Sequence, residues 1–290
     1  MTSGWIILDK PTGMFSRRAA GIVARMFGTR TFGHIGTLDE MATGVLPIAI
    51  GAATKMIPFV EDVRPSVKEY LFSVQFGIET DTLDVFGREI ARTDITPTHD
   101  AVIRALGQLV GDIDQIPPAY SAVHIDGQRA YDVARRGAVV DIPPRRVHID
   151  LLELLTVRDN IWTFRTRCTR GTYVRAIARD IAKICGTVAT VTMIRRTESI
   201  GFTIKDTVKL DFLENLFNNS GDFGTYLKPT DFGLGDIPVQ NLDDKSAELY
   251  KNGGFITTGG ADGLRRVYNG SVFIGIGRVT DGVLHPKRTI

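Results

Sequence analysis

Apolar residues in the first part of the chain alternate between short continuous runs and helical spacing. Residues 5–8 and 45–50 are continuous apolar runs, which predict two short buried strands. Residues 16–27 carry apolar side chains at helical spacing, so they predict a helix with Ser16 as its N-cap. Residues 69–78 have strand character. The pattern therefore predicts strands and helices in mixed order.

The middle of the chain predicts a hairpin followed by a helix. Two strand patterns, 147–157 and 161–169, flank an Asp-Asn pair that suits a tight turn. Residues 172–185 are predicted to be helical, and another strand is expected near 199–204. Because strands and helices do not alternate regularly, we expect an α+β fold rather than a doubly wound α/β fold.

The composition changes after the middle of the chain. Residues 231–238 are rich in glycine and aspartate and predict a linker. From about residue 237 the chain is rich in glycine, valine and short strand patterns, which predict a small β-rich module. We therefore expect a larger domain, 1–236, and a smaller one, 237–290.

The overall charge says little about function. The chain of 290 residues is 43% hydrophobic and 23% charged, as is usual for globular proteins, and its net charge is only +2. The distribution is more informative, because many arginines stand in adjacent pairs and others cluster between positions 165 and 179. Such arginines are either solvated surface residues or part of a face that binds phosphates.

Several classes of site are missing from the sequence. Cys168 and Cys185 form no C-x-x-C and the histidines show no metal-ligand spacing, so neither a disulfide framework nor a zinc site is expected. No complete P-loop or dinucleotide-binding pattern occurs. The N-terminus lacks a signal-peptide pattern, and no apolar stretch reaches the roughly 20 residues that span a bilayer. We expect a cytoplasmic protein that works without a metal or cofactor.

The most informative stretch is the glycine-rich segment 33–47. Glycines at 33, 36 and 44 give the backbone access to turns that are closed to other residues. Within the segment, Asp39 follows His34 by five residues, which predicts a loop that displays a carboxylate. On local context alone, the commoner role for such an aspartate is an Asx-turn or a helix cap.

The catalytic signature of the TruB family, the bacterial tRNA pseudouridine-55 synthases, resembles this stretch, which reads GHIGTLDEMATGVLP. The usual family form is close to G-H-x-G-T-L-D-P-x-A-T-G-V-L-P. The chain departs from it at Glu40, where the family has proline, and at Ile35, a frequent threonine; Phe15 replaces a serine of the first family motif. The resemblance extends over essentially the whole chain, and it is strongest in this segment.

The resemblance implies three catalytic residues. Asp39 falls on the catalytic aspartate, and Arg175, in the segment CTRGTYVR, falls on the arginine that pairs with it. An arginine suits that role, because its charge is permanent and its planar fork matches a carboxylate. Tyr70, in the segment KEY, falls on the tyrosine that holds the target uracil and is a candidate to take the C5 proton. Without the family, the last two are an ordinary helix arginine and an ordinary core aromatic.

The resemblance also implies contacts with the substrate. Lys10 and Pro11 are expected to buttress the active site, and His34 to enter the RNA where the target base leaves. Ile194 is expected to pack in the base pocket, with one of the two arginines that follow it near a phosphate. The residues that we expect to bind substrate are Lys10, Pro11, His34, Lys55, Ile194 and Arg195.

The activity implied by the resemblance is the isomerisation of the uridine at position 55 in the T-loop of tRNA. The family acts on the T-arm without a guide RNA, a cofactor or a protein partner, and we expect a monomer. The implied fold is the pseudouridine synthase fold, a mixed and mainly antiparallel central sheet flanked by helices and loops. The tail resembles a shortened PUA-like RNA-binding module.

Two other functions stay open. One is a guide-RNA-dependent synthase subunit similar to dyskerin-like relatives, which the short tail and the lack of lysine-rich extensions disfavour. The other is a tRNA-folding chaperone without catalysis. A glycosidase fits poorly, because it needs two placed carboxylates and the signature supplies one clear candidate. The sequence does not distinguish attack by Asp39 on the sugar C1′ from attack on the base.

Overall fold

A mixed sheet organises most of the structure. The protein is described by a computed structural model that covers residues 2–121, 123–125, 128–136 and 141–290. Within these residues the sheet has ten strands in the order β14-β1-β3-β12-β4-β11-β10-β7, with β2 beside β3 and β13 beside β12. Its strands are β1 (Gly4–Lys10), β2 (Phe32–His34), β3 (Thr43–Ile50), β4 (Val67–Phe76), β7 (Gly111–Gln115), β10 (Arg145–Arg158), β11 (Ile161–Thr169), β12 (Ala189–Ser199), β13 (Phe202–Thr203) and β14 (Val208–Lys209).

The strands of this sheet pair mainly in antiparallel fashion. Among the described strands of this sheet, only β1 with β14 and β3 with β12 are parallel. The predicted hairpin is β10–β11, and its turn residues Asp159 and Asn160 both have positive φ, 46° and 63°. Turns of this hand match the right-handed twist of the two strands. This architecture confirms the α+β prediction.

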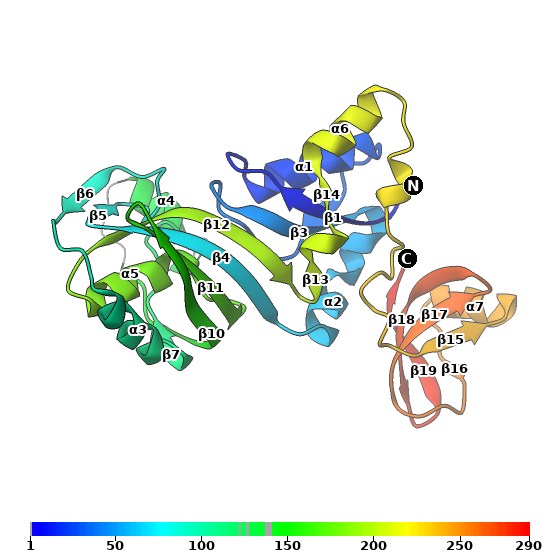
Figure 1. Ribbon diagram of the computed structural model, residues 1–290. Helices are drawn as coiled ribbons and strands as arrows, with labels where there is room; N and C mark the ends of the chain where they lie inside the picture. Colours follow the sequence, from blue (N-terminus) through cyan, green and yellow to red (C-terminus); the bar gives the residue numbers. More distant parts are fainter. Residues whose placement is uncertain (1, 122, 126–127, 137–140) are drawn as a thin grey trace.

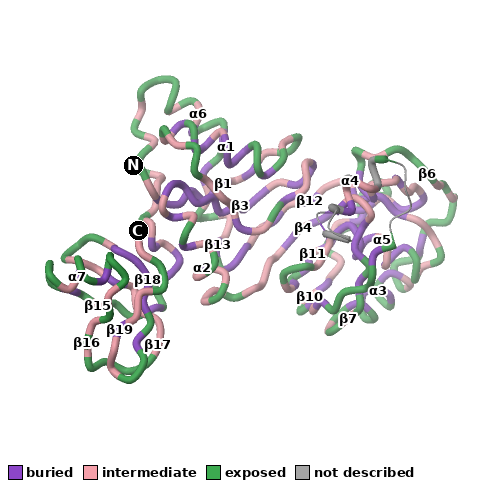
Figure 2. The backbone as a smooth tube through the Cα atoms, turned by 180° about the vertical axis from the view of Figure 1, so that it is seen from behind, coloured by how far each residue is buried: buried purple, intermediate pink, exposed green. Residues whose placement is uncertain are grey.

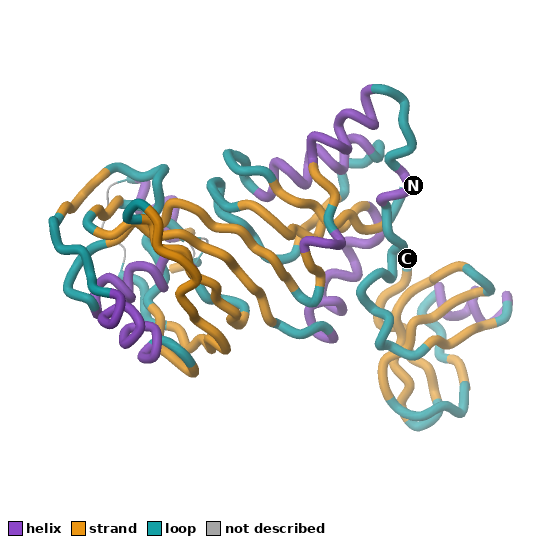
Figure 3. Tube along the Cα trace, viewed as in Figure 1, coloured by secondary structure: helices purple, strands orange, loops and turns teal. Residues whose placement is uncertain are grey.

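Helices lie on both halves of the sheet (Figures 1 and 3). α3 and α5 pack near β10, β4 and β12, whereas α1 and α6 pack near β3 and β1. None of the described helices combines the length and the apolar composition needed to cross a bilayer. The helices are α1 (Ser16–Met26), α2 (Ile57–Val63), α3 (His99–Gln108), α4 (Ala130–Arg135), α5 (Val174–Ile184) and α6 (Leu210–Asn218), with 3₁₀ helices η1 (Gly51–Met56), η2 (Ile204–Asp206) and η3 (Gly224–Tyr226).

Two small antiparallel ribbons stand outside the main sheet. One pairs β5 (Ile78–Thr80) with β6 (Glu89–Arg92), and the other pairs β8 (His124–Ile125) with β9 (Gln128–Arg129). The two strands of the first ribbon flank the turn 81–88. This turn lies close to α5, because its Asp84 approaches Arg175.

The C-terminal part forms a separate sheet, as the sequence predicts. Its strand order is β15-β17-β18-β19-β16, and α7 packs on it through Tyr250, which is buried with Val267 and Ile274. The predicted linker is tied to this sheet, because Asp231 accepts hydrogen bonds from Arg266 (2.8 Å) and from the Tyr268 hydroxyl. The elements are β15 (Val239–Leu242), α7 (Asp244–Lys251), β16 (Ile256–Thr257), β17 (Gly263–Asn269), β18 (Val272–Thr280) and β19 (Val283–Thr289).

Two local predictions are wrong. Ser16 does not cap α1, because its hydroxyl donates to the backbone carbonyl of Leu38 and accepts from the Leu38 N–H, at 2.9 and 2.8 Å. The strand expected near 199–204 is reduced to β13, and the long strand before it, β12, lies in the middle of the sheet. The charged residues of β12 interrupt the apolar pattern expected of a buried strand, although one of them, Arg196, is fully buried.

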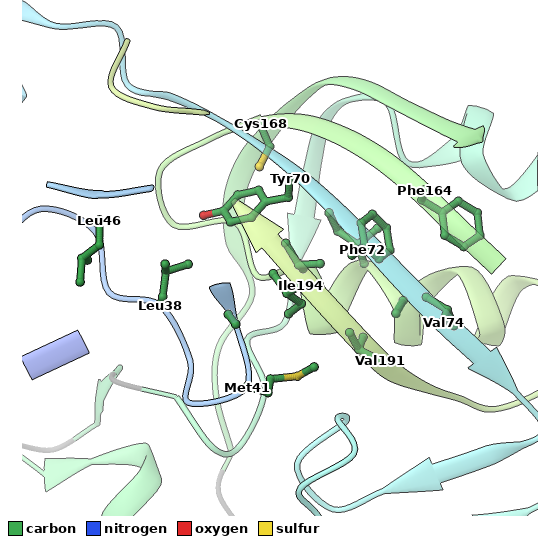
Figure 4. Close-up of a cluster of buried hydrophobic side chains, with 14 of the residues drawn as sticks. Leu38, Met41, Leu46, Tyr70, Phe72, Val74, Phe164, Cys168, Val191 and Ile194 are labelled. Carbon is green, nitrogen blue, oxygen red and sulfur yellow. The ribbon is translucent and has the colours of Figure 1, made fainter. Parts of the chain in front are cut away.

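The largest apolar cluster lies beneath the glycine-rich segment. Figure 4 shows Leu38 and Met41 from that segment beside Tyr70 of β4 and Ile194 of β12, with Phe72 farther along β4. Buried backbone also runs along β4, β12 and α5 in Figure 2, whereas the outer loops are exposed. Burial of these side chains stabilises the segment by about 25 cal/mol for each Å² removed from water.

Candidate active site

The loop between β2 and β3 carries Asp39 and is held from both sides. Leu38, Met41 and Ala42 are buried, which packs the loop against the core. The hydroxyl of Ser16 bonds both backbone groups of Leu38, and the N–H of Gly13 donates to the carbonyl of Glu40 at 2.9 Å. With its neighbours anchored in this way, the carboxylate of Asp39 remains 41% exposed.

A buried guanidinium holds the Asp39 carboxylate in a fixed orientation. Arg175 donates from Nε to Oδ2 at 2.8 Å and from Nη2 to Oδ1 at 3.0 Å. The arginine side chain is only 4% exposed. Such a bidentate charge-assisted pair is among the stronger polar contacts in proteins, and it fixes direction as well as distance.

The rest of the Arg175 guanidinium is held by residues that the sequence analysis did not single out. Nη1 donates to the carbonyl of Thr82 at 2.7 Å, and Nη2 donates to the carbonyl of Tyr120 at 3.0 Å. The carboxylate of Asp84 lies 3.7 Å from Nη1. Asp84 is buried and also accepts from the Thr82 hydroxyl and the Phe86 N–H. A Thr-Asp-Thr-Leu-Asp run before a glycine was the available sequence signal.

Tyr70 belongs to the same neighbourhood. Its ring is buried in the apolar cluster with Leu38 and Ile194, and Figure 4 shows its hydroxyl directed toward the side on which Leu38 lies. Burial raises the pKa of the Tyr70 phenol, whereas the positive charge of Arg196, its partner across the strands, acts to lower it. The phenol is therefore protonated at neutral pH before substrate enters.

Two fully buried cations bind backbone carbonyls around the loop. The ammonium of Lys10 donates to the carbonyls of Pro11, Met14 and Glu40, and burial lowers its pKa to about 8. Arg196 donates from Nε to the carbonyl of Val45 and from Nη2 to that of Gly36, both at 2.8 Å. The carbonyls of Glu40 and Gly36 belong to the loop that carries Asp39, so each cation helps to position this loop.

The remaining predicted residues make contacts with groups other than the Asp39 carboxylate. His34 is half-buried at the end of β2, and burial lowers its pKa with a further contribution from Arg196. Arg195 forms a bidentate pair with Asp9, at 3.1 and 2.9 Å. Lys55 instead donates to the carbonyl of Thr289 at 3.1 Å, which places it at the junction with the C-terminal sheet.

The site therefore unites the partly exposed carboxylate of Asp39 with the guanidinium of Arg175, the phenol of Tyr70 and buried cations. Among the described residues, no three His, Cys, Asp or Glu side chains come together as metal ligands. Such a set can supply a nucleophile or an anionic stabiliser, an aromatic face and a proton acceptor.

Comparison with known proteins identifies the family. Residues 24–174 match the N-terminal domain of TruB family pseudouridylate synthases, and residues 238–290 match the C-terminal region of pseudouridine synthase II TruB. The tRNA pseudouridine synthase B of Bradyrhizobium diazoefficiens is 40% identical over 98% of this chain and 85% of the relative. That of Novosphingobium aromaticivorans is 40% identical over 99% of this chain and 97% of the relative.

The chain belongs to the TruB family. It is therefore a pseudouridylate synthase, an isomerase. Its TruB signature is the loop that carries Asp39, and the departures at Glu40 and Ile35 leave the bidentate contact with Arg175 in place.

Solved structures of more distant proteins share the fold of this TruB family member. An H/ACA RNP bound to a substrate RNA containing 2′-deoxyuridine is 19% identical, with a TM-score of 0.68 over 99% of this chain and 84% of that chain. An archaeal box H/ACA sRNP Nop10-Cbf5 complex is 20% identical, with a TM-score of 0.68 over 99% of this chain and 85% of that chain. At this identity the likeness concerns the fold alone.

Proposed function

We propose that this protein isomerises the uridine at position 55 in the T-loop of tRNA to pseudouridine without a guide RNA. The names of the relatives, tRNA pseudouridine synthases B at 40% identity over nearly the full chain, support tRNA as the substrate. The observation that carries the proposal is the partly exposed Asp39 carboxylate held bidentately by buried Arg175.

Asp39 acts as the nucleophile or as the anion that stabilises the sugar cation. The planar guanidinium of Arg175 holds the carboxylate in one direction. The bidentate contact leaves the outer lone pairs of the carboxylate directed away from the arginine, where a nucleoside can approach. Both the sugar C1′ and the base remain candidate targets of the attack.

The reaction rearranges one nucleotide without net oxidation. The N1–C1′ bond breaks, the uracil turns, and a C5–C1′ bond forms; C5 then loses a proton and N1 gains one. Tyr70 holds the base from below; its phenol gives its own proton to N1 and, as the phenolate, takes the C5 proton. No external reductant, oxidant or cofactor is required by this balance, and binding groups fixed in place beforehand supply the rate enhancement.

The target base has to leave the folded T-loop before it can reach Asp39. Extrusion costs about a few kcal/mol, and filling the vacated space offsets part of that cost. We assign this role to His34 and assign the base pocket to Ile194, which is buried beside Tyr70. Lys10 and Pro11 buttress the loop, and Arg195 and Lys55 face the RNA from outside the pocket.

The organisation that we propose has a catalytic domain at 1–236 and a PUA-like domain at 237–290. The protein acts as a monomer and requires no protein partner. A division near residue 237 agrees with the start of the C-terminal sheet at Val239.

The decisive experiment maps pseudouridine in an unmodified tRNA transcript after incubation with the purified protein. The wild type is expected to convert the T-loop uridine, and Asp39→Asn to leave it unchanged. Glu40→Gln is the matched control, because it neutralises the adjacent carboxylate, which makes no hydrogen bond or ion pair through its side chain among the described residues. Conversion by Asp39→Asn would overturn the role of Asp39.

The alternatives give different results in the same assay. A guide-dependent subunit would bind the transcript but convert no uridine until a guide RNA is added. A tRNA chaperone without catalysis would convert none under either condition. Tight binding by Asp39→Asn would be compatible with a second, chaperone role for an active enzyme.

A further inference from the structure

Arg196 is a fully buried cation that has no counter-ion within the described part of the chain. Its Nε and Nη2 donate to the carbonyls of Val45 and Gly36. Its Nη1 is buried as well, but it meets no described atom at hydrogen-bond geometry. A buried charge without a neutralising partner is costly, and an unsatisfied buried donor adds to that cost. Such a group calls for an explanation in function rather than in stability.

The unneutralised charge of Arg196 acts on the titratable groups around it. Burial lowers the pKa of His34 and of Lys68, and the charge of Arg196 lowers both of them further. The position that a Cβ on Gly36 would occupy lies 3.0 Å from Arg196 Nη1 and 3.2 Å from the Lys68 ammonium, so the two cations are neighbours. The unsatisfied donor therefore lies in a region of positive potential that favours an oxyanion.

Tyr70 is the neighbour that can supply this oxyanion. Tyr70 and Arg196 are directly opposite each other on β4 and β12, so their side chains leave the sheet on the same face. Figure 4 shows the phenol directed toward Leu38, and the guanidinium reaches the same loop at Gly36. Burial raises the pKa of the phenol, whereas the charge and the hydrogen-bonding capacity of Arg196 act to lower it, although Nη1 completes no hydrogen bond.

The other charged groups of the site are less suited to stabilise a phenolate at Tyr70. The guanidinium of Arg175 is already occupied by the Asp39 carboxylate and by two backbone carbonyls. The Asp39 carboxylate itself disfavours a second negative charge at Tyr70. Lys68 has a pKa of about 8, because burial lowers it, whereas Arg196 keeps its charge at every pH at which the protein works.

We propose that Arg196 is a positioning residue that stabilises the phenolate of Tyr70 during the isomerisation. The inference rests on the proposed function, because that function assigns the proton transfers to Tyr70. When the phenol gives its proton to N1, its oxygen becomes an anion that accepts a hydrogen bond from Arg196 Nη1. The phenolate then takes the proton from C5 and becomes a phenol again, so the guanidinium keeps all of its own protons. A donor fixed in place beforehand stabilises the anion without reorganisation.

The test varies the acidity of the phenol with and without the arginine. Tyr70 is replaced by 3-fluorotyrosine, which is a more acidic phenol, in the wild type and in Arg196→Lys. Lysine keeps the charge but cannot hold both carbonyls and also reach the phenol. Single-turnover rates are measured on an unmodified tRNA transcript at saturating RNA, and fluorine NMR follows the ionisation of residue 70. The matched control is Arg64→Lys, because Arg64 donates from Nε to the carbonyl of Gly233 outside the site.

We expect Arg196→Lys to lower the single-turnover rate about 100-fold when residue 70 is tyrosine, and the fluorotyrosine to recover about tenfold of this loss. In the wild type and in Arg64→Lys, the fluorotyrosine should change the rate by less than about threefold. The pKa of the fluorotyrosine should be about one unit higher in Arg196→Lys than in the wild type, because its phenolate has lost a donor.

Equal effects of the fluorotyrosine in both proteins, or an unchanged pKa, overturn the role of Arg196, because a more acidic phenol does not compensate for a merely structural arginine. If Arg196→Lys does not fold, Gly36→Ala takes its place, since a Cβ there lies 3.0 Å from Nη1 and displaces it while the cation stays in the core. If the wild type converts no uridine, the proposed function fails, and the pKa comparison still decides whether Arg196 stabilises the phenolate.

Discussion

Arg175 and Asp39 are separated by 136 residues in the chain, yet the guanidinium contacts both oxygens of the carboxylate, at 2.8 and 3.0 Å. The arginine is itself fixed by the carbonyls of Thr82 and Tyr120. The orientation of the carboxylate therefore depends on α5 and on the turn 81–88 as well as on its own glycine-rich loop.

Replacing Arg175 with lysine tests this orientation. Lysine keeps the charge but cannot form the bidentate contact or reach both carbonyls, so we expect the single-turnover rate to fall about 100-fold. Binding of tRNA should change little. Arg179→Lys is the control on the same helix, since Arg179 pairs with its neighbour Asp180, and a similar rate loss there would contradict the prediction.

Removing the hydroxyl of Tyr70 tests its proposed role in moving the C5 proton. Tyr70→Phe keeps the aromatic ring that we propose to hold the base, so we expect the dissociation constant for tRNA to stay within about twofold. The rate at saturation should fall by about 10²–10⁴-fold, as is usual when a proton acceptor is lost. Tyr226→Phe serves as the control, and full activity of Tyr70→Phe would rule out the phenol as the acceptor.

Gly44 has to be glycine for the loop to fold over β12. Its φ is +104°, and a Cβ there would lie 2.1 Å from the backbone carbonyl oxygen of Arg196. We expect Gly44→Ala to lower the free energy of unfolding by about 4 kcal/mol, from backbone strain and overpacking together. At Gly13 (φ +71°) a Cβ meets nothing, so Gly13→Ala should cost about 1 kcal/mol. Equal costs in denaturant unfolding would contradict this account.

The low pKa of Lys10 predicts an alkaline loss of activity. Burial lowers this pKa to about 8, and the charged form donates to three carbonyls around the loop. We therefore expect the single-turnover rate to fall as pH rises through about 8. Lys10→Gln should be about tenfold slower at pH 7, because Asp39 is less well placed, and should lack this alkaline fall.

The lowered pKa of Lys10 affects stability in the opposite direction, because stability is expected to rise with pH where activity falls. Because the folded-state pKa of Lys10 lies below the unfolded value of 10.5, the folded protein binds fewer protons between pH 8 and 10.5. The contribution of Lys10 to the free energy of unfolding thus rises in that window, so lost activity would not reflect unfolding. Lys68 has a pKa of about 8 as well but makes no hydrogen bond to the loop among the described residues, so Lys68→Gln should retain the alkaline fall.

The apolar pattern located most of the elements but misplaced one central strand. Continuous runs correctly predicted β1 and β3, because both are buried on two faces of the sheet. β12 was missed, since its sequence contains Arg195, Arg196 and Glu198. Arg196 is tolerated in the core only because two backbone carbonyls accept from it, and that arrangement is not visible in a local pattern.

The sequence by itself determined the family, the loop that carries Asp39 and the division into strands and helices, because these depend on residue type and short-range spacing. Only the tertiary structure decided that Arg175, Thr82, Asp84 and Tyr120 meet at one guanidinium, and that Lys55 joins the C-terminal sheet. These contacts join segments that are distant in the chain. Their geometry follows from how the whole sheet and its helices pack, which no local periodicity encodes.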